Sequence, residues 1–254
     1  MVGWLVGGLA GRAVTLAEKI LDRERCRRFA HHFIFESGNL RTKDEHDQED
    51  PVKTFPDQRY LRVLVDLLLL SGRWIEPGQA SFAIAAGMDA DYLGAVRRVG
   101  VLCVEKSRQV LATWTVCAYV LWRAKFHPYQ LILVQSKRED DAANLVFNRD
   151  PTVARISFME LALPSHLKSG ESLKKATYAQ LLFPNGSRIW GIPEGGDVIR
   201  SNTPSLIVSD EAAFQPEFSG SYAAAQPAVQ GGGQYVAISS AEPGAYGDLI
   251  EVNL

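Results

Sequence analysis

The sequence has few cysteines and no large excess of charge of either sign. Its three cysteines, Cys26, Cys103 and Cys117, show no paired spacing, which argues against disulfides or a zinc site and is typical of a reducing compartment. The formal net charge of −2 excludes a polycation that wraps DNA. Contacts with phosphate backbones must therefore come from local patches such as the arginine-rich segment 23–28, whose other interpretation is a solvated helix face.

A membrane-spanning or secretory segment is also lacking at the start of the chain. The opening run Met1–Ala10 is apolar, but it is far shorter than the ~20 residues that a membrane helix needs. It also lacks the charged start of a signal peptide. We therefore expect a soluble, intracellular protein without a membrane partner.

The length and the hydrophobic content allow a full core. The 254 residues, 46% of them hydrophobic, are enough for one large domain or two small ones. We expect an N-terminal helical segment and a charged, solvated loop over residues 1–54, with helix over 14–35 and the loop over 39–54. The core domain is predicted over 55–254.

Strand and helix patterns alternate in the core domain, which predicts an α/β fold with a mostly parallel sheet. The run Gln130–Gln135 has the composition of a buried parallel strand and precedes a helix, which together indicate a right-handed βαβ unit. The segments 177–183 and 187–191, joined by a Pro-Asn-Gly turn, predict an antiparallel β-hairpin beside that sheet.

Glycine is missing from a segment where its absence matters. Residues 101–114 read as strand, polar loop and helix, the order of a phosphate-binding loop. The pattern G-x-x-x-x-G-K-[ST] would end at Thr113, whose hydroxyl could bind Mg²⁺, but Ala112 stands at its lysine position. Leu111 and Lys106 replace its two glycines. By pattern alone, an ordinary basic strand-to-helix loop is the competing interpretation.

Two adjacent carboxylates, Asp210 and Glu211, directly follow the apolar run Leu206–Val208. A buried strand that ends in two acids suits ATP hydrolysis, because the first can hold Mg²⁺ through water and the second can orient and deprotonate the attacking water. In an open α/β sheet, ligands bind at this carboxyl end of the strands. An acidic helix N-terminus is the other interpretation.

Three segments together resemble the ATPase domain of the large terminase subunit of tailed bacteriophages. Many members carry a phosphate loop of the form K-x-R-Q-x-G-x-[ST], a strand ending in Asp-Glu-Ala and a later Ser/Thr-rich motif. This chain has Lys106–Thr113, Asp210–Phe214 and Ile238–Gly244 in that order. The resemblance covers roughly residues 20–254 and implies a RecA-like (ASCE) P-loop NTPase fold.

The resemblance also implies roles for individual residues. The nucleotide-binding residues would be Lys106, Ser107, Arg108, Gln109, Val110, Leu111, Ala112, Thr113 and Trp114. Lys106 would neutralise phosphate charge, Thr113 and Asp210 would hold Mg²⁺, and Glu211 would be the catalytic base. The motif Ser239, Ser240 and Ala241 would couple the state of the γ-phosphate to movement of an attached domain.

Two further sets of residues are candidates by resemblance. Gln58, Arg59 and Tyr60 stand where the family forms its adenine pocket, with helix capping by Asp57 as the competing account. Arg138 follows the strand over 130–135, where some terminases present an arginine to the γ-phosphate of a neighbouring subunit. A surface ion pair is the alternative for Arg138.

The resemblance implies an ATP-hydrolysing motor that moves double-stranded DNA into a procapsid, with ATP and Mg²⁺ as cofactors. Its partners would be DNA, a portal protein, a small terminase subunit and further copies of the chain in a ring, in the cytoplasm of the bacterial host. A nuclease domain would follow the third motif, so we expect the ATPase half alone. A helicase-like translocase and a nucleotide-independent structural ring module are the alternatives.

Overall fold

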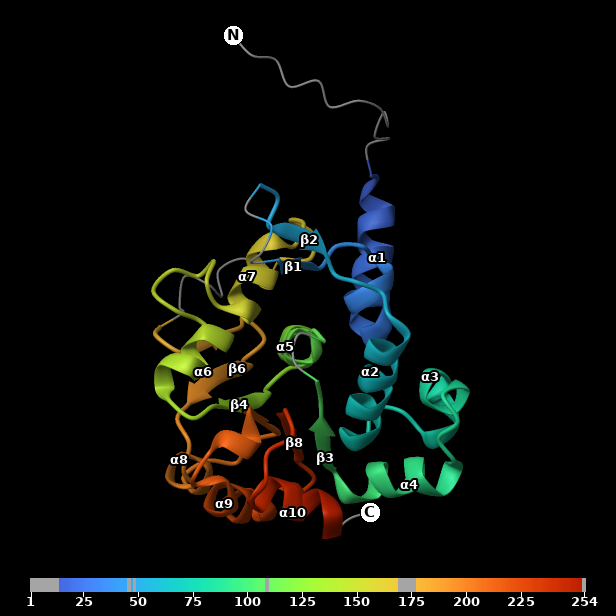
Figure 1. The fold of residues 1–254 in the computed structure, drawn as a ribbon. Coiled ribbons are helices and arrows are strands. Elements are labelled where there is room, and N and C mark those ends of the chain that lie inside the picture. The colour runs from blue at the N-terminus through green and yellow to red at the C-terminus, as the bar shows by residue number, and fades with distance from the viewer. Residues whose placement is uncertain (1–13, 45–46, 48, 108–109, 169–176, 253–254) are drawn as a thin grey trace.

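A six-stranded, mostly parallel sheet forms the centre of the protein (Figure 1). The computed structural model describes residues 14–44, 47, 49–107, 110–168 and 177–252. The strands of the sheet are β3 (Val101–Glu105), β4 (Leu131–Gln135), β5 (Gln180–Leu182), β6 (Arg188–Ile192), β7 (Leu206–Asp210) and β8 (Gln234–Ser239). Their order is β3-β8-β7-β4-β6-β5, and only β5 runs antiparallel to its neighbour.

The strand order brings three strand ends to one edge of the sheet. Strand β8 lies between β3 and β7, with Glu105 opposite Ser239 and Asp210 opposite Ile238. One strand thus separates the strand before the predicted phosphate loop, residues 106–113, from the strand that ends in the acidic pair. This is the arrangement of RecA-like folds, and the predicted fold class is confirmed.

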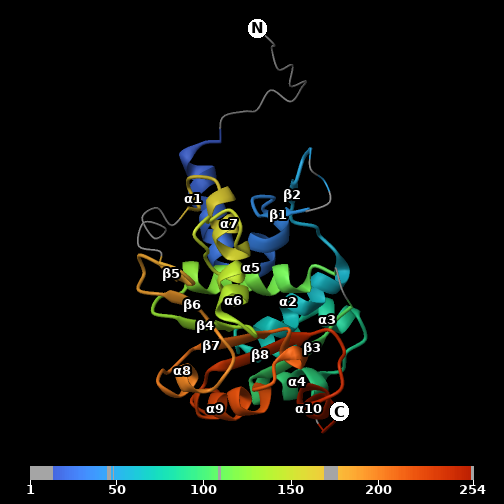
Figure 2. The same ribbon diagram turned by 60° about the vertical axis from the view of Figure 1, so that its left-hand side comes forward.

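Helices cover both faces of the sheet. On one face lie α2 (Arg59–Ser71), α5 (Ala112–Phe126) and α7 (Arg155–Ala162), and on the other lie α8 (Asp197–Arg200), α9 (Phe218–Gln230) and α10 (Ala245–Val252). Figure 2 shows α5 and α9 on opposite sides of the strands. Alternate residues of each strand therefore enter different cores: Val208 packs under α5, whereas Ile207 packs against α9. This double coverage explains why β7 and β8 are buried along their whole length.

Smaller elements complete the chain. They are α1 (Leu16–Arg28), a π-helical turn (His32–Glu36), β1 (Arg41–Lys43), β2 (Val52–Thr54), a 3₁₀ turn (Pro77–Gln79), α3 (Ser81–Ala85), α4 (Ala90–Val99), α6 (Glu139–Leu145) and a 3₁₀ turn (Ala212–Phe214). None of the helices in the described ranges is both long enough and apolar enough to cross a membrane.

The segment 39–54 differs from its prediction as a solvated loop. Its ends form the two-stranded antiparallel pair β1 and β2, with Arg41 opposite Thr54. Thr42 is buried where β1 packs on α7. The carboxylate of Asp47 helps to close the connection by pairing with Lys53 at 2.7 Å. The many charged residues of this segment predicted a loop. A short antiparallel strand, however, needs only one buried face, and its other face can carry charged residues.

Other predicted elements are found with small shifts of their ends. The hairpin over 177–191 is present as β5 and β6, and β4 with α6 forms the predicted strand and helix. The helix predicted over 14–35 is divided in two: α1 ends at Arg28, and a π-helical turn begins at His32. Buried residues of both segments, such as Cys26 and Phe33, share one core with α5. The division of the chain at residue 54 stays a prediction.

Candidate functional site

The predicted phosphate loop and the acidic pair lie together at the carboxyl edge of the sheet. The loop starts beside β8, where the amide of Lys106 donates to the carbonyl oxygen of Ser239 at 2.9 Å. The Lys106 Nζ atom lies 2.8 Å from Glu211 Oε1. The Thr113 hydroxyl donates to Asp210 Oδ1 at 3.1 Å. Four side chains from two distant segments thus meet at the edge where α/β folds bind ligands.

Leu111 has the backbone conformation for which glycine is usually selected. Its φ and ψ are 55° and 12°, in the left-handed region, which costs a residue with a side chain about 1–2 kcal/mol. Its carbonyl oxygen accepts the first hydrogen bond of α5, from the amide of Thr115 at 2.9 Å. The loop therefore enters α5 with a glycine-like turn although it contains no glycine.

The site opens into a cavity of about 1210 Å³, which exceeds the usual ~300–1,000 Å³ of a small-molecule pocket. Its walls include Lys106, residues 110–114, Asp210, Glu211 and Ser240. The opposite wall comes from β1, β2, α6 and the start of α7. A molecule as large as a nucleoside triphosphate fits this space.

Asp210 carries a buried carboxylate that lies near a second carboxylate, a hydroxyl and two cationic side chains. Burial raises its pKa to about 6, and the charge of Glu211 adds to this shift. The guanidinium of Arg155, the hydroxyl of Thr113 and the ammonium of Lys106 act in the opposite direction. Near neutral pH the carboxylate is thus ionised although burial disfavours its charge, and a bound cation would offset this free-energy cost. Carboxylate and hydroxyl oxygens are ligands that fit Mg²⁺.

Glu211 is held at the end of β7 in a left-handed conformation, with a φ of 50°. Its Oε2 atom lies 3.5 Å from both the hydroxyl of Ser239 and the amide of Ser240. The Ser239 hydroxyl also accepts from the amide of Ala213 at 3.1 Å. Two members of the predicted coupling motif therefore contact the predicted base, whereas Ala241 is exposed.

The remaining loop candidates differ in their surroundings. Ser107 is exposed, and Arg108 and Gln109 lie outside the described residues. Trp114 is half-buried and meets the ring of Phe158 edge to face at 6.1 Å between centroids.

The three predicted adenine-pocket residues stand at the start of α2, with Gln58 just before the helix, and none of them is among the lining residues of the cavity. The Tyr60 hydroxyl donates to the carbonyl oxygen of Val110 at 3.1 Å, which ties α2 to the predicted phosphate loop. The guanidinium of Arg59 instead donates to the carbonyl oxygen of Ala85. Gln58 is the N-cap, and no side chain caps α2, since Asp57 pairs with Arg62 at 2.6 Å. Capping by Asp57 is therefore wrong, and the adenine role stays a prediction.

Arg138 lies outside the cavity. Its side chain is 76% exposed and pairs with Asp141 at 3.0 Å, so the surface ion pair that the sequence left open is present. A pair this exposed contributes little to stability. Its proposed action on a neighbouring subunit stays a prediction.

Four basic residues of the cavity wall were not among the predicted site residues: Lys43, Lys53, Lys137 and Arg155. Arg155 begins α7, and its guanidinium carbon lies 5.7 Å from the ring centroid of Trp114. Within the described ranges no carboxylate pairs with it. Lys137 also lines the cavity, directly after β4. The position of Lys137 after a parallel strand could have predicted its place in the site, because ligands bind at the carboxyl ends of such strands. No local sequence pattern marks Arg155.

Fold and site together define the class as a RecA-like α/β domain with a large cavity at the carboxyl ends of its strands. Among solved structures, the chain is similar to the large terminase ATPase domain of Thermus phage P74-26, with 16% identity, a TM-score of 0.42, and coverage of 57% of this chain and 61% of that domain. No protein-family model and no curated protein matches the sequence.

Two longer structures are also similar. The large terminase of bacteriophage HK97 matches with 14% identity and a TM-score of 0.41 over 60% of this chain, and a large terminase from a thermophilic bacteriophage in complex with ADP matches with 13% identity and a TM-score of 0.36 over 56%. The match covers 33% of each of these longer chains.

Proposed function

We propose that the chain is the ATP-hydrolysing domain of a motor that moves double-stranded DNA into a viral procapsid. The observation that carries the proposal is the meeting of Lys106, Thr113, Asp210 and Glu211 at one edge of the sheet. A basic residue, a hydroxyl, a buried carboxylate and a second carboxylate are the groups that phosphoryl transfer to water requires. The order of the three motifs along the chain directs the proposal to a packaging motor.

Each residue has a distinct task in the proposed reaction. Lys106 binds the phosphates, and the amides at the start of α5 add the positive end of a helix. Asp210 and Thr113 would hold Mg²⁺, which neutralises phosphate charge when bound. Glu211 orients a water molecule and accepts its proton.

The ion pair between Lys106 and Glu211 supports an exchange of partners during the cycle. A γ-phosphate competes with Glu211 for the ammonium of Lys106, because both are anions. Once Lys106 turns to phosphate, the carboxylate of Glu211 is free to accept a proton. The contacts of Glu211 with Ser239 and Ser240 then carry this change into β8.

DNA, a portal protein, a small terminase subunit and a ring of copies are the partners in this proposal. Completion of the site by a neighbouring subunit would make turnover depend on assembly. The test is steady-state ATP hydrolysis measured against protein concentration, with Glu211→Gln as control. We expect turnover that rises faster than linearly and that the variant loses.

Two results would contradict the proposal. Retained turnover in Glu211→Gln would remove the assigned base. The absence of both turnover and Mg²⁺-dependent ATP binding by calorimetry would favour a structural ring module. Strand separation by the isolated chain would instead indicate a helicase-like translocase.

A further inference from the structure

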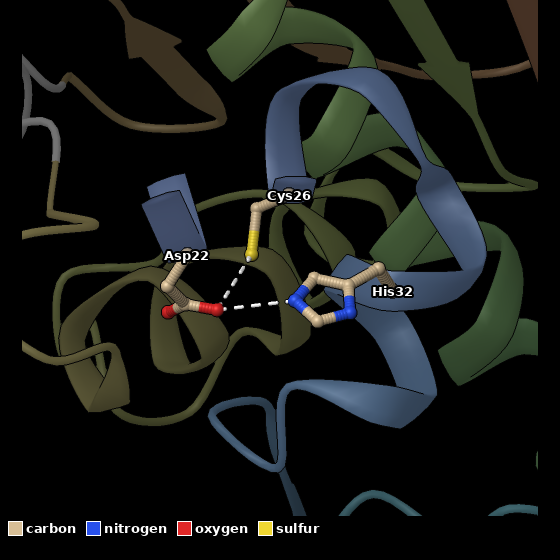
Figure 3. Close-up of side chains that lie close together, drawn as sticks. All are labelled: Asp22, Cys26 and His32. Carbon is tan, nitrogen blue, oxygen red and sulfur yellow. Dashed lines mark hydrogen bonds and ion pairs between the residues drawn. The ribbon is translucent and has the colours of Figure 1, made fainter. Parts of the chain in front are cut away.

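A second cluster of metal-binding side chains lies on α1, outside the nucleotide cavity. Asp22 and Cys26 are one helical turn apart, and His32 follows in the π-helical turn. One ligand atom from each lies within 4.8 Å of the other two. Figure 3 shows the thiol, the imidazole and the carboxylate pointing toward one another. The fold also brings His166 to the second oxygen of the same carboxylate.

The spacings are close to those of a tetrahedral site. Zinc bonds of about 2.0–2.1 Å to nitrogen or oxygen and about 2.3 Å to sulfur place neighbouring ligand atoms roughly 3.3–3.6 Å apart. Asp22 Oδ1 lies 3.1 Å from His32 Nε2 and 3.8 Å from Cys26 Sγ. His166 Nε2 lies 2.9 Å from Asp22 Oδ2. The ligand atoms of Asp22, Cys26 and His32 all lie within 4.8 Å of one another, whereas His166 is outside this set and contacts the second oxygen of Asp22.

The surroundings of His32 provide a second observation. Its other ring nitrogen, Nδ1, lies 3.4 Å from Glu36 Oε2. Glu36 is itself held by Arg62 at 3.0 Å. Metal-binding histidines usually direct their second nitrogen to a carboxylate, which fixes the ring and increases its basicity. This arrangement leaves Nε2 of His32 directed at Asp22.

Burial and chain connectivity suit a structural site. Cys26 is fully buried, whereas Asp22, His32 and His166 are partly exposed, so an ion has access from their side. His166 lies 144 residues from Asp22 in the sequence. An ion at this point would hold α1 and the π-helical turn against the segment that follows α7.

We propose that Asp22, Cys26 and His32 bind a divalent cation of the zinc class, and that His166 positions the carboxylate of Asp22. Thiolate and imidazole ligands favour Zn²⁺ over Mg²⁺ or Ca²⁺, which prefer oxygen. The spacing of the cysteines did not predict this site, because the site contains a single cysteine and its other ligands are an aspartate and a histidine. The site is independent of the proposed ATP hydrolysis.

The test is a cobalt(II) titration of the full chain after removal of metal with a chelator. Cobalt is the probe because it takes the tetrahedral geometry of zinc and gives a thiolate charge-transfer band in the near ultraviolet. We expect a single equivalent to bind with that band, and zinc to remove the band. Cys26→Ser should lose it, and Cys103→Ser, which changes a thiol in β3, should keep it.

A histidine variant keeps the test decisive if Cys26→Ser does not fold. His166→Gln should retain the charge-transfer band but bind cobalt at least 10-fold more weakly, the usual loss for an altered metal shell. His127→Gln, which lies outside the cluster, should bind as the unaltered chain does. No band in the unaltered chain, or a band that neither Cys26→Ser nor His166→Gln changes, would mean that the cluster is a hydrogen-bond network only.

Discussion

The proposed nucleotide site and the cluster on α1 use polar side chains in contrasting ways. The proposed nucleotide site gathers carboxylate, hydroxyl and ammonium groups at three strand ends around a large cavity. The α1 cluster gathers sulfur, nitrogen and oxygen within 4.8 Å. An open cavity with charges of both signs suits a ligand that binds reversibly and is exchanged. Closely spaced ligand atoms suit a structural metal ion. Four predictions test the chemistry of the proposed nucleotide site.

The largest expected effect is on turnover. Glu211→Gln should reduce ATP hydrolysis by about 10²–10⁴-fold, because the amide is unable to accept a proton from water. Binding of Mg²⁺-ATP should change little, as measured by calorimetry. Glu217→Gln is the matched control, since Glu217 is exposed and lies in the same connection between β7 and α9. Equal loss in both variants would place the base elsewhere.

The second effect is on stability and depends on pH. Burial raises the pKa of Asp210 from 3.8 to about 6 in the folded state. Ionisation of Asp210 therefore lowers the free energy of unfolding. This loss is absent below pH ~4, grows as pH rises through about 6, and reaches at most ~3 kcal/mol at higher pH. Asp210→Asn, whose amide oxygen still accepts from Thr113, should remove this loss.

Urea unfolding at pH 8 and pH 4 checks this prediction. The free energy of unfolding of Asp210→Asn should exceed that of the unaltered chain at pH 8 and equal it at pH 4. The variant should also lose Mg²⁺-dependent ATP hydrolysis. A variant that is less stable at pH 8 would show that the buried charge is already compensated in the folded protein.

The third effect concerns Arg155, the cationic side chain that no motif marks. Arg155→Gln should weaken ATP binding about 10- to 150-fold, because a charged contact with phosphate is worth roughly 1.5–3 kcal/mol. Arg149→Gln, an exposed neighbour in the sequence, is the control. Unchanged affinity in Arg155→Gln would leave its guanidinium with a packing role against Trp114 alone.

The smallest effect is expected at Leu111. Leu111→Gly should relieve left-handed strain of about 1–2 kcal/mol but lose the packing of a half-buried side chain and add flexibility to the unfolded chain. These effects oppose one another, so stability should change by less than ~1 kcal/mol. ATP affinity should change by less than about 3-fold, as measured by calorimetry. A much larger gain in affinity would mean that the leucine holds the loop away from phosphate.

Local patterns were sufficient for the six strands of the central sheet, their order along the chain and the acidic pair. Val101–Glu105 and Leu206–Asp210 are apolar runs of strand length followed by polar residues, and such runs are recognised without their partners. The segment 39–54 was misread because its charges hide one buried position, Thr42, which only packing against α7 explains.

The sequence by itself determined the α/β order and the identity of Lys106, Thr113, Asp210 and Glu211 as candidates, because residue type and spacing limit what each segment can do. Only the tertiary structure decided that these side chains are in contact and that Arg155 faces them. It also decided that His166 meets Asp22 across 144 residues. Contacts between distant segments depend on strand order and packing, which local patterns do not encode.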